Sequence, residues 1–347
     1  MDHPSERRDN HTAMKTLGYL VLGLALSGPE RGVAQAAGGG AAPPQATISN
    51  GLVHIRFYLP DTAAGYYRGT RFDWSGVMPD LDYNGHQYSG QWFKTYAPTT
   101  HDALMGPVES FGPLGYGQGG RFIAIGIGTL KQIDDKPYNP FRYYPILDPG
   151  TWRIKQYKDR IVFTQKLEKA YLYTKTIRLL KGKAQFVITH TLRNTSDKTI
   201  ETDVYDHNLF PIDQQPTGPG LILSFPFRIA ATQQRGNSAR IDDSSIVFDR
   251  TLVGKEDAYA VLSGYGNDSK DYDIRIVNHR TGAGMRITGD RPLSRLVFWA
   301  SATTACPEAY IHIKIEPGAS FSWSISYQLY DEKKSTAGSA VAKRLHT

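Results

Sequence analysis

The stretch YLYTKTIRLLKGKAQFVITHTL, residues 171–192, decides the fold class. Two runs rich in β-branched and aromatic residues, 171–180 and 186–192, flank a short turn segment that contains Gly182. Phe186, Ile188 and Leu192 recur at the two-residue period that places side chains on one face of a strand. The pattern predicts a β-hairpin.

Similar runs continue along the chain, separated by Gly, Pro and Asn-Asp signals. The clearest cover residues 52–59, 121–130, 161–167, 221–229 and 310–315, and a second hairpin turn is expected at 194–198. No internal repeat of about 20–50 residues is found, which argues against a propeller or a β-helix. No Pro/Ser/Gly-rich linker divides the chain after residue 45. We therefore expect one all-β domain over residues 46–332, a large sandwich of antiparallel strands.

Composition narrows the function classes. Hydrophobic residues make up 40% and charged residues 21% of the 347, as in a globular protein with a core. Tyrosine is the main aromatic residue, with 21 copies, and it combines an apolar ring with a hydroxyl that suits a sugar, although β-rich proteins favour aromatic residues in any case. The net charge of +7 is scattered, without a basic run, so nucleic acid is not expected as a partner, while an acidic sugar stays open.

The N-terminus has the pattern of a secretory signal peptide. Lys15 precedes an apolar run over residues 17–26, and Ala34-Gln35-Ala36 fits a small-x-small cleavage site. We assign residues 1–36 to the signal, with Met14 as a possible start, 37–45 to a disordered linker and 333–347 to a flexible tail. The apolar run is too short to span a bilayer. A periplasmic or secreted protein is expected, in which the sole cysteine forms no internal disulfide.

Two short polar segments could carry chemistry. Asp206-His207-Asn208 interrupts the alternation of a strand, and Cys306-Pro307-Glu308 precedes the predicted strand 310–315. A histidine and a carboxylate in one pocket can act as acid and base on the same substrate. The first segment would also suit a turn whose Asp and Asn bond their own backbone, and Glu308 would also suit an ordinary exposed loop.

The order of these segments resembles that of the galactose mutarotase-like superfamily, the aldose 1-epimerases and their relatives. The resemblance rests on THTLRNT (189–195), YDHNLF (205–210), CPEAY (306–310), EPG (316–318) and SWSISY (322–327), and it covers most of residues 46–330. It implies a β-supersandwich fold, His207 as the catalytic acid and Glu308 as the base, with no metal or organic cofactor. Asp206 stands where epimerases usually have Asn. The family's second histidine has no exact counterpart, and His101 is the nearest candidate.

Further candidates for binding a substrate come from the N-terminal part of the domain. The segment YYRGTRFDW (66–74) offers Arg68, Arg71, Asp73 and Trp74. Arg supplies a rigid fork of donors for hydroxyls or a carboxylate, and Trp can stack on a sugar face. The two arginines point to opposite sides of a strand, so we expect Arg71 to face the substrate rather than Arg68.

Three further segments were weighed for sites. Glu109, in the loop-like stretch 106–112, could be a second sugar-binding carboxylate, and a surface position is its alternative. His190 alternates in phase with the core residues of its strand, so we expect a core histidine there. The glycine-rich stretch 115–120 does not join a strand to a helix, and no zinc-binding pattern is present.

The functional hypotheses are therefore ordered. The first is an exported aldose 1-epimerase-like enzyme acting on a mono- or oligosaccharide, with Asp206 and Asn208 beside His207 at the sugar. The second is a polysaccharide lyase or glycoside hydrolase on the same scaffold, because one fold hosts many chemistries. The third is a non-catalytic glycan-binding module, which would not need His207 and Glu308. No pattern in the sequence specifies an oligomeric state.

Overall fold

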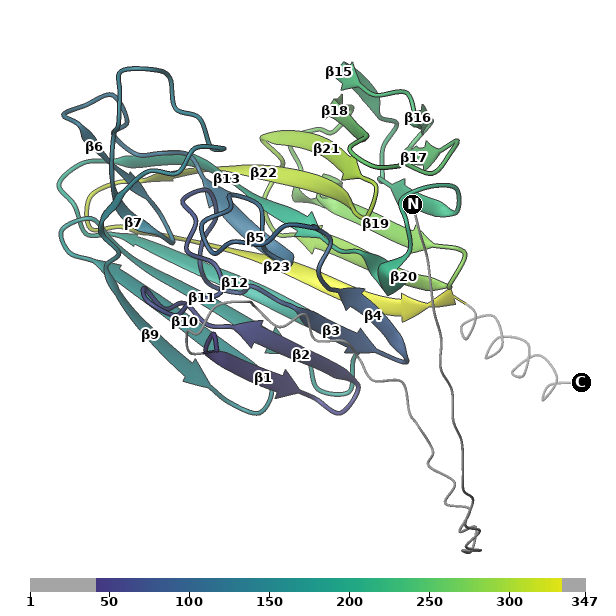
Figure 1. Cartoon of the computed structure of the whole chain (residues 1–347), viewed down its shortest axis with the longest axis horizontal. Helices are drawn as coiled ribbons and strands as arrows, with labels where there is room; N and C mark the ends of the chain where they lie inside the picture. Colours follow the sequence, from purple (N-terminus) through teal and green to yellow (C-terminus); the bar gives the residue numbers. More distant parts are fainter. Residues whose placement is uncertain (1–41, 333–347) are drawn as a thin grey trace, which may run out of the picture. The chain divides into compact units, whose positions relative to one another are not determined.

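Strands with alternating buried and exposed residues build the largest sheet, which has ten antiparallel members (Figure 1). In β11 and β12 alternate side chains are buried, as the apolar period predicts. The order across the sheet is β16 (Ala239–Asp242), β17 (Ser245–Phe248), β14 (Leu221–Ser224), β19 (Asp273–Asn278), β20 (Ala283–Gly289), β23 (Ser320–Asp331), β12 (Gln185–Asn194), β11 (Tyr171–Leu179), β10 (Arg160–Leu167) and β9 (Thr151–Gln156).

A second, six-stranded antiparallel sheet covers the first (Figure 1). Its order is β15 (Ala230–Arg235), β18 (Asp257–Ser263), β21 (Arg295–Ser301), β22 (Ala305–Ile315), β13 (Ile200–Leu209) and β5 (Gly106–Phe111). Between the two sheets the ring of Phe111 on β5 packs 5.6 Å from Tyr173 on β11 and 6.2 Å from Trp323 on β23. Burial of such aromatic surfaces is the main force that holds the two layers together.

Two smaller antiparallel sheets complete the described part of the chain. One consists of β1 (Gln45–Ser49), β2 (Val53–Tyr58), β3 (Asp80–Tyr83) and β4 (His86–Ser89), the other of β6 (Arg121–Ala124), β7 (Gly128–Lys131) and β8 (Ile146–Asp148). Two single-turn 3-10 helices, η1 (Ile212–Gln214) and η2 (Ser269–Asp271), lie in connections. Within residues 42–332 no helix has the length and apolar character needed to cross a membrane.

The computed structural model describes residues 42–332, which belong to one structural unit. The expected signal peptide and C-terminal tail lie outside these residues. The expected linker 37–45 is described only at its end, where the Pro44 carbonyl accepts a hydrogen bond from the Leu59 amide (2.8 Å) and β1 begins at Gln45. The expected fold class, an all-β antiparallel sandwich, is confirmed.

The predicted hairpin at residues 171–192 is also confirmed, since β11 and β12 pair across the turn. The predicted second hairpin at 194–198 is wrong, because β12 and β13 belong to different sheets and the chain crosses between the layers there. The run 121–130 is two strands, with Gly126 at φ 81° in the turn between them. A side chain at Gly126 would collide with Asp73, so the close approach requires glycine.

Two expected strands have different bounds. The run 221–229 forms a strand only up to Ser224. Glu308 was expected just before a strand, but it lies inside β22, which begins at Ala305. Pro307 is accommodated next to it because its carbonyl, rather than a missing amide, bonds the Asn208 side chain (2.8 Å). The longer strand matters for function, since it places Glu308 in register with β13.

Candidate functional site: a cleft on the six-stranded sheet

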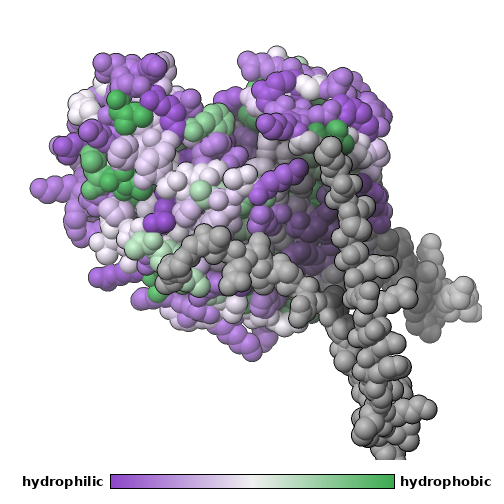
Figure 2. All heavy atoms as spheres, viewed as in Figure 1, coloured by the Kyte–Doolittle hydropathy of each residue, from purple (hydrophilic) through white to green (hydrophobic). Residues whose placement is uncertain are grey.

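A cleft of about 730 Å³ lies over the outer face of the six-stranded sheet. Its floor is formed by β13, β22 and β21, and one wall carries Arg235 of β15 and Tyr259 of β18. The opposite wall carries Tyr138 and Phe141 from the loop between β7 and β8. Figure 2 shows a hollow at the upper edge of the view, between the parts that carry these strands. The size suits a small ligand such as a sugar.

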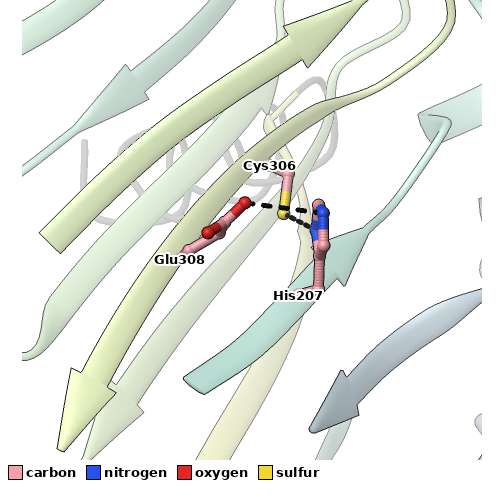
Figure 3. A group of neighbouring side chains, drawn as sticks. All are labelled: His207, Cys306 and Glu308. Carbon is pink, nitrogen blue, oxygen red and sulfur yellow. Dashed lines mark hydrogen bonds and ion pairs between the residues drawn. The ribbon is translucent and has the colours of Figure 1, made fainter. Parts of the chain in front are cut away.

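His207 and Glu308 form the centre of the floor. They are directly opposite each other on the paired strands β13 and β22, with both side chains on the cleft face. His207 Nε2 lies 3.4 Å from Glu308 Oε1, as the close-up shows (Figure 3). Both side chains are buried, with 5% and 6% of their surface exposed. The sheet register therefore brings together the two residues that the sequence singled out as acid and base.

Cys306 contacts the other ring nitrogen of His207. It precedes Glu308 by two residues on β22, so both side chains are on the same face of that strand. Its Sγ lies 2.6 Å from His207 Nδ1, and the residue is fully buried beneath the ring (Figure 3). The aromatic rings of Phe72 (5.5 Å) and Trp299 (5.6 Å) pack against the imidazole. The orientation of the imidazole is therefore defined from several sides.

These three residues are also the set among residues 42–332 that comes nearest to a metal site, with one ligand atom of each within 4.8 Å of the others. However, the sulfur faces Nδ1 and the carboxylate faces Nε2. One imidazole cannot present both nitrogens to the same ion. The arrangement is therefore a chain of hydrogen-bonding groups, and closing it around a metal would require the ring to turn.

Burial changes the protonation of the pair. It raises the pKa of Glu308 to about 7, although the positive charge of Arg71 opposes part of this effect. Burial also holds the pKa of His207 well below its ordinary value, and Arg71 lowers it further. Two groups with pKa values displaced in opposite directions are typical of an acid–base pair. Near neutral pH, the proton of this pair resides mainly on Glu308, and the imidazole is neutral.

Arg71 lies on the cleft wall beside the pair. Its Nη2 donates a hydrogen bond to the Tyr205 hydroxyl (3.2 Å), and its guanidinium packs over the rings of Phe72 (4.6 Å) and Phe141 (4.7 Å). Within the described residues no ion pair joins Arg71 to a carboxylate, and its Nε has no hydrogen-bond partner. The cleft therefore contains a mostly buried cation without an acidic partner.

The other residues of the segment 66–74 do not reach the cleft. Arg68 does not line it, in agreement with the expectation that only one of the two arginines faces the substrate. Trp74 is buried, and its Nε1 donates to the Gly69 carbonyl (2.9 Å) rather than standing free to stack on a sugar. His101 lies next to the rim, 3.4 Å from Asp102 and with its ring against Phe141 at 5.2 Å.

Asp73 and Glu109 belong to a fully buried ionic cluster between the two sheets. The ammonium of Lys175 contacts the Glu109 carboxylate, lies 3.4 Å from Asp73 Oδ2 and donates to the Ser75 carbonyl (2.9 Å). His190 Nε2 lies 2.6 Å from the other Glu109 oxygen. The expected substrate-facing positions of Asp73 and Glu109 are corrected by this placement, whereas His190 is the core histidine that its strand pattern predicted.

Asp206 and Asn208 point away from the cleft. Because successive side chains of a strand alternate, the residues on either side of His207 face the ten-stranded sheet. There the Tyr327 hydroxyl lies 2.8 Å from Asp206 Oδ2 and 3.0 Å from Asn208 Oδ1. Burial raises the pKa of Asp206 well above its ordinary value. The expectation that both flanking residues contact the sugar with His207 does not fit this geometry.

Several cleft residues were not singled out from the sequence. Tyr205 and Tyr310 stack on each other at 4.3 Å on the floor, and Arg295, Val297 and Trp299 project from β21. Each is an even number of residues from His207 or from a cross-strand partner of Cys306 and Glu308. The two-residue period, applied outward from His207 and Glu308, was the signal that could have found them.

Comparison with known proteins places this architecture. No protein-family model matches the chain, and no curated protein matches it in sequence. Solved structures do match in fold. The GalM/aldose epimerase homologue from C. elegans aligns with a TM-score of 0.52 and 12% identity, over 84% of this chain and 99% of that one. The galactose mutarotase related enzyme from Lactobacillus acidophilus gives 0.52 and 12%, over 83% and 98%.

A third structure, the Slr1438 protein from Synechocystis sp. PCC 6803, aligns with a TM-score of 0.51 and 12% identity, over 84% of this chain and 97% of that one. The likeness covers nearly the whole of each matched chain. At this identity it establishes the fold. The protein has the galactose mutarotase-like β-sandwich fold, as the resemblance in its sequence implied.

Proposed function

We propose that the protein is an exported aldose 1-epimerase-like enzyme, which interconverts the anomers of a sugar by acid–base catalysis. The single observation that carries the proposal is the buried pair of His207 and Glu308 at the floor of the cleft, 3.4 Å apart. A fold shared with aldose epimerase homologues is a further support. Export rests on the signal-like N-terminal sequence alone.

The proposed reaction needs one proton donor and one acceptor. Protonated Glu308 donates its proton to the ring oxygen, while Nε2 of neutral His207 accepts the proton of the anomeric hydroxyl. The bond between C1 and the ring oxygen breaks, and C1 becomes a carbonyl carbon. Rotation about C1–C2 then presents the other face, and ring closure reverses both transfers. Each well-placed acid or base contributes about 10²–10⁴-fold to such a reaction.

This assignment exchanges the roles that the sequence resemblance implied, in which His207 is the acid and Glu308 the base. The pKa of Glu308 is raised to about 7 and that of His207 is lowered, so the proton is more stable on the carboxyl group. Both assignments use the same pair carrying one proton. They differ only in which partner holds that proton before the sugar binds.

The surroundings of the pair suit a carbohydrate. Tyr205, Tyr310 and Trp299 give the floor apolar rings with polar edges, which match the C–H faces and hydroxyl rim of a pyranose. Arg71, which has no acidic partner among the described residues, favours a sugar that carries a carboxylate. We therefore propose an aldose or a uronic acid as the substrate class.

The test is anomeric exchange, followed by NMR for a panel of aldoses and uronic acids with wild-type protein and Glu308→Gln. Acceleration that disappears in Glu308→Gln is the expected result. If no sugar exchanges faster than in buffer, the epimerase proposal is wrong. Sugar binding without exchange would then indicate a glycan-binding module.

One contact favours a second candidate, a polysaccharide lyase. A lyase needs a tyrosine or histidine base near a cation that neutralises a uronate carboxylate, and Tyr205 lies 3.2 Å from Arg71. Against it, burial raises the pKa of Tyr205, which makes the phenolate costly to form. Incubation with uronate-containing oligosaccharides separates the two functions, because only a lyase leaves an unsaturated sugar at the new chain end.

A further inference from the structure

Cys306 takes no part in the mechanism above, yet it is one of the nearest neighbours of the imidazole. Its Sγ lies 2.6 Å from Nδ1 of His207, and its other polar contact is the Pro307 carbonyl at 4.0 Å. The thiol is fully buried and does not line the cleft. A substrate in the cleft therefore meets the imidazole and not the sulfur.

The position of the sulfur determines which ring nitrogen faces the cleft. With Nδ1 held by Cys306, Nε2 is directed at Glu308 and is the nitrogen that can accept a proton. The charged and titratable groups around the ring are Glu308 and Cys306 from β22, Arg71 from the segment before β3, and Tyr205 from β13. Among these contacts only the Cys306 thiol has a printed contact with Nδ1.

A thiol is suited to this position because it can both donate and accept a hydrogen bond. When Nε2 carries the ring hydrogen, the S–H group can donate to Nδ1. When Nδ1 carries it, the sulfur can accept. Burial raises the pKa of the Cys306 thiol well above its ordinary value, so the sulfur keeps its hydrogen and stays neutral. The ring can thus exchange a proton at Nε2 without losing its partner at Nδ1.

We propose that Cys306 is a positioning residue, which holds Nδ1 of His207 so that Nε2 faces Glu308 and the substrate in either protonation state of the ring. The inference rests on the proposed acid–base function for its catalytic consequence. The hydrogen bond itself does not depend on which reaction the cleft performs, and it is tested separately.

The direct test is NMR of the full chain labelled with ¹⁵N-histidine, with the His207 signals identified by their loss in His207→Gln. Cys306→Ala is expected to shift the Nδ1 resonance toward that of a nitrogen without a partner. Cys306→Ser, whose hydroxyl also donates and accepts, is expected to keep a bonded Nδ1. An Nδ1 resonance unchanged in Cys306→Ala would overturn the proposal. Thermal unfolding of both variants checks that the fold is retained.

Anomeric exchange gives the catalytic half of the test. We expect Cys306→Ala to lower kcat about 10–100-fold with little change in KM, because a misplaced base loses rate rather than binding. Cys306→Ser is expected to retain most of kcat. Equal kcat in Ala and Ser variants would overturn the catalytic role. If the wild type shows no exchange but Nδ1 responds to Cys306→Ala, the epimerase function fails and the positioning contact stands.

A final arm separates positioning from metal binding. The full chain is dialysed against zinc chloride, and the bound metal is measured by mass spectrometry for wild type and Cys306→Ala. Retention of no stoichiometric zinc is the expected result. One equivalent of zinc that is lost in Cys306→Ala would show that the three side chains turn to form a coordination site, and would overturn the proposal.

Discussion

His207 and Glu308 face each other across the β13–β22 pair, with Nε2 3.4 Å from Oε1. The two residues are about a hundred positions apart in sequence, and the hydrogen-bonded register of two adjacent strands fixes their separation. Groups on rigid strands need little reorganisation before a proton moves. The sheet therefore supplies the precision that an acid–base pair requires.

Removal of either member of the pair is expected to abolish catalysis. Glu308→Gln and His207→Gln should each lower kcat for anomeric exchange by about 10²–10⁴-fold, since each removes one of the two proton carriers. His312→Gln is the matched control, because His312 is also on β22 but exposed, and paired with Asp203 (3.0 Å) away from His207. Measurement by NMR exchange should show the control unchanged. Equal loss in the control would mean that the effect is structural.

Activity is expected to fall as the pH rises through about 7. The pKa of Glu308 in the folded protein is raised to about 7, so below that pH the pair carries the proton that the reaction needs. Above it, Glu308 is ionised and His207 is already neutral, which leaves a base without an acid. The pH dependence of kcat measures this limb. A rate that rises through the same range would contradict the assignment.

Replacing Arg71 should move that limb to higher pH. The positive charge lowers the pKa of both Glu308 and His207, so Arg71→Met raises both pKa values. Arg68→Met is the matched control, because Arg68 lies in the same segment and does not line the cleft. The comparison is between the midpoints of the alkaline limb. An unchanged midpoint in Arg71→Met would show that the guanidinium does not act on the pair.

The buried cluster around Lys175 is expected to govern stability rather than activity. Lys175→Met leaves the Glu109 and Asp73 carboxylates without their cation at a site with no exposure, which should cost about 3–5 kcal/mol of unfolding free energy. The pKa of Glu109 is lowered to about 2, largely against the cost of burial, by Lys175 and His190. Urea unfolding of Lys175→Met and of an exposed control, Lys314→Met, measures the difference.

The same carboxylate predicts how stability depends on pH. A group whose pKa is depressed on folding contributes stability above its ordinary pKa, here 4.5, and loses that contribution as the pH falls toward about 2. The unfolding free energy of the wild type should therefore decrease below about pH 4.5. Glu109→Gln, which has no titrating group, should show a smaller decrease. Parallel curves for the two proteins would contradict this role of Glu109.

The sequence predicted the fold class because alternation over many strands is a strong local signal, as in residues 171–192. It also pointed to His207 and Glu308. It did not predict which neighbours share their face, because Asp206-His207-Asn208 was taken as one polar unit. The two-residue period separates them, with His207 at the cleft and the other two at Tyr327.

The buried cluster could not be predicted for a different reason. Asp73, Glu109 and Lys175 come from a loop segment and from strands of different sheets, and only the packing of the two sheets brings them together. A carboxylate in a glycine-containing segment has the local pattern of a surface or binding residue. Its burial depends on a lysine 66 positions away, and no local pattern identifies that partner.

Arg71 predicts a preference for acidic sugars. Its guanidinium lies on the cleft wall, is mostly buried and has no carboxylate partner among residues 42–332, so a ligand carboxylate would supply the missing counter-charge. A uronic acid should therefore have a lower KM for anomeric exchange than the aldose of the same configuration. Arg71→Met should raise the KM of the uronic acid by about 10-fold or more and leave that of the aldose nearly unchanged, since a charge-assisted hydrogen bond contributes about 1.5–3 kcal/mol. Arg68→Met should change neither. If wild-type protein and Arg71→Met show the same ratio of KM values, Arg71 does not select for charge, and its role is confined to the pKa values of His207 and Glu308.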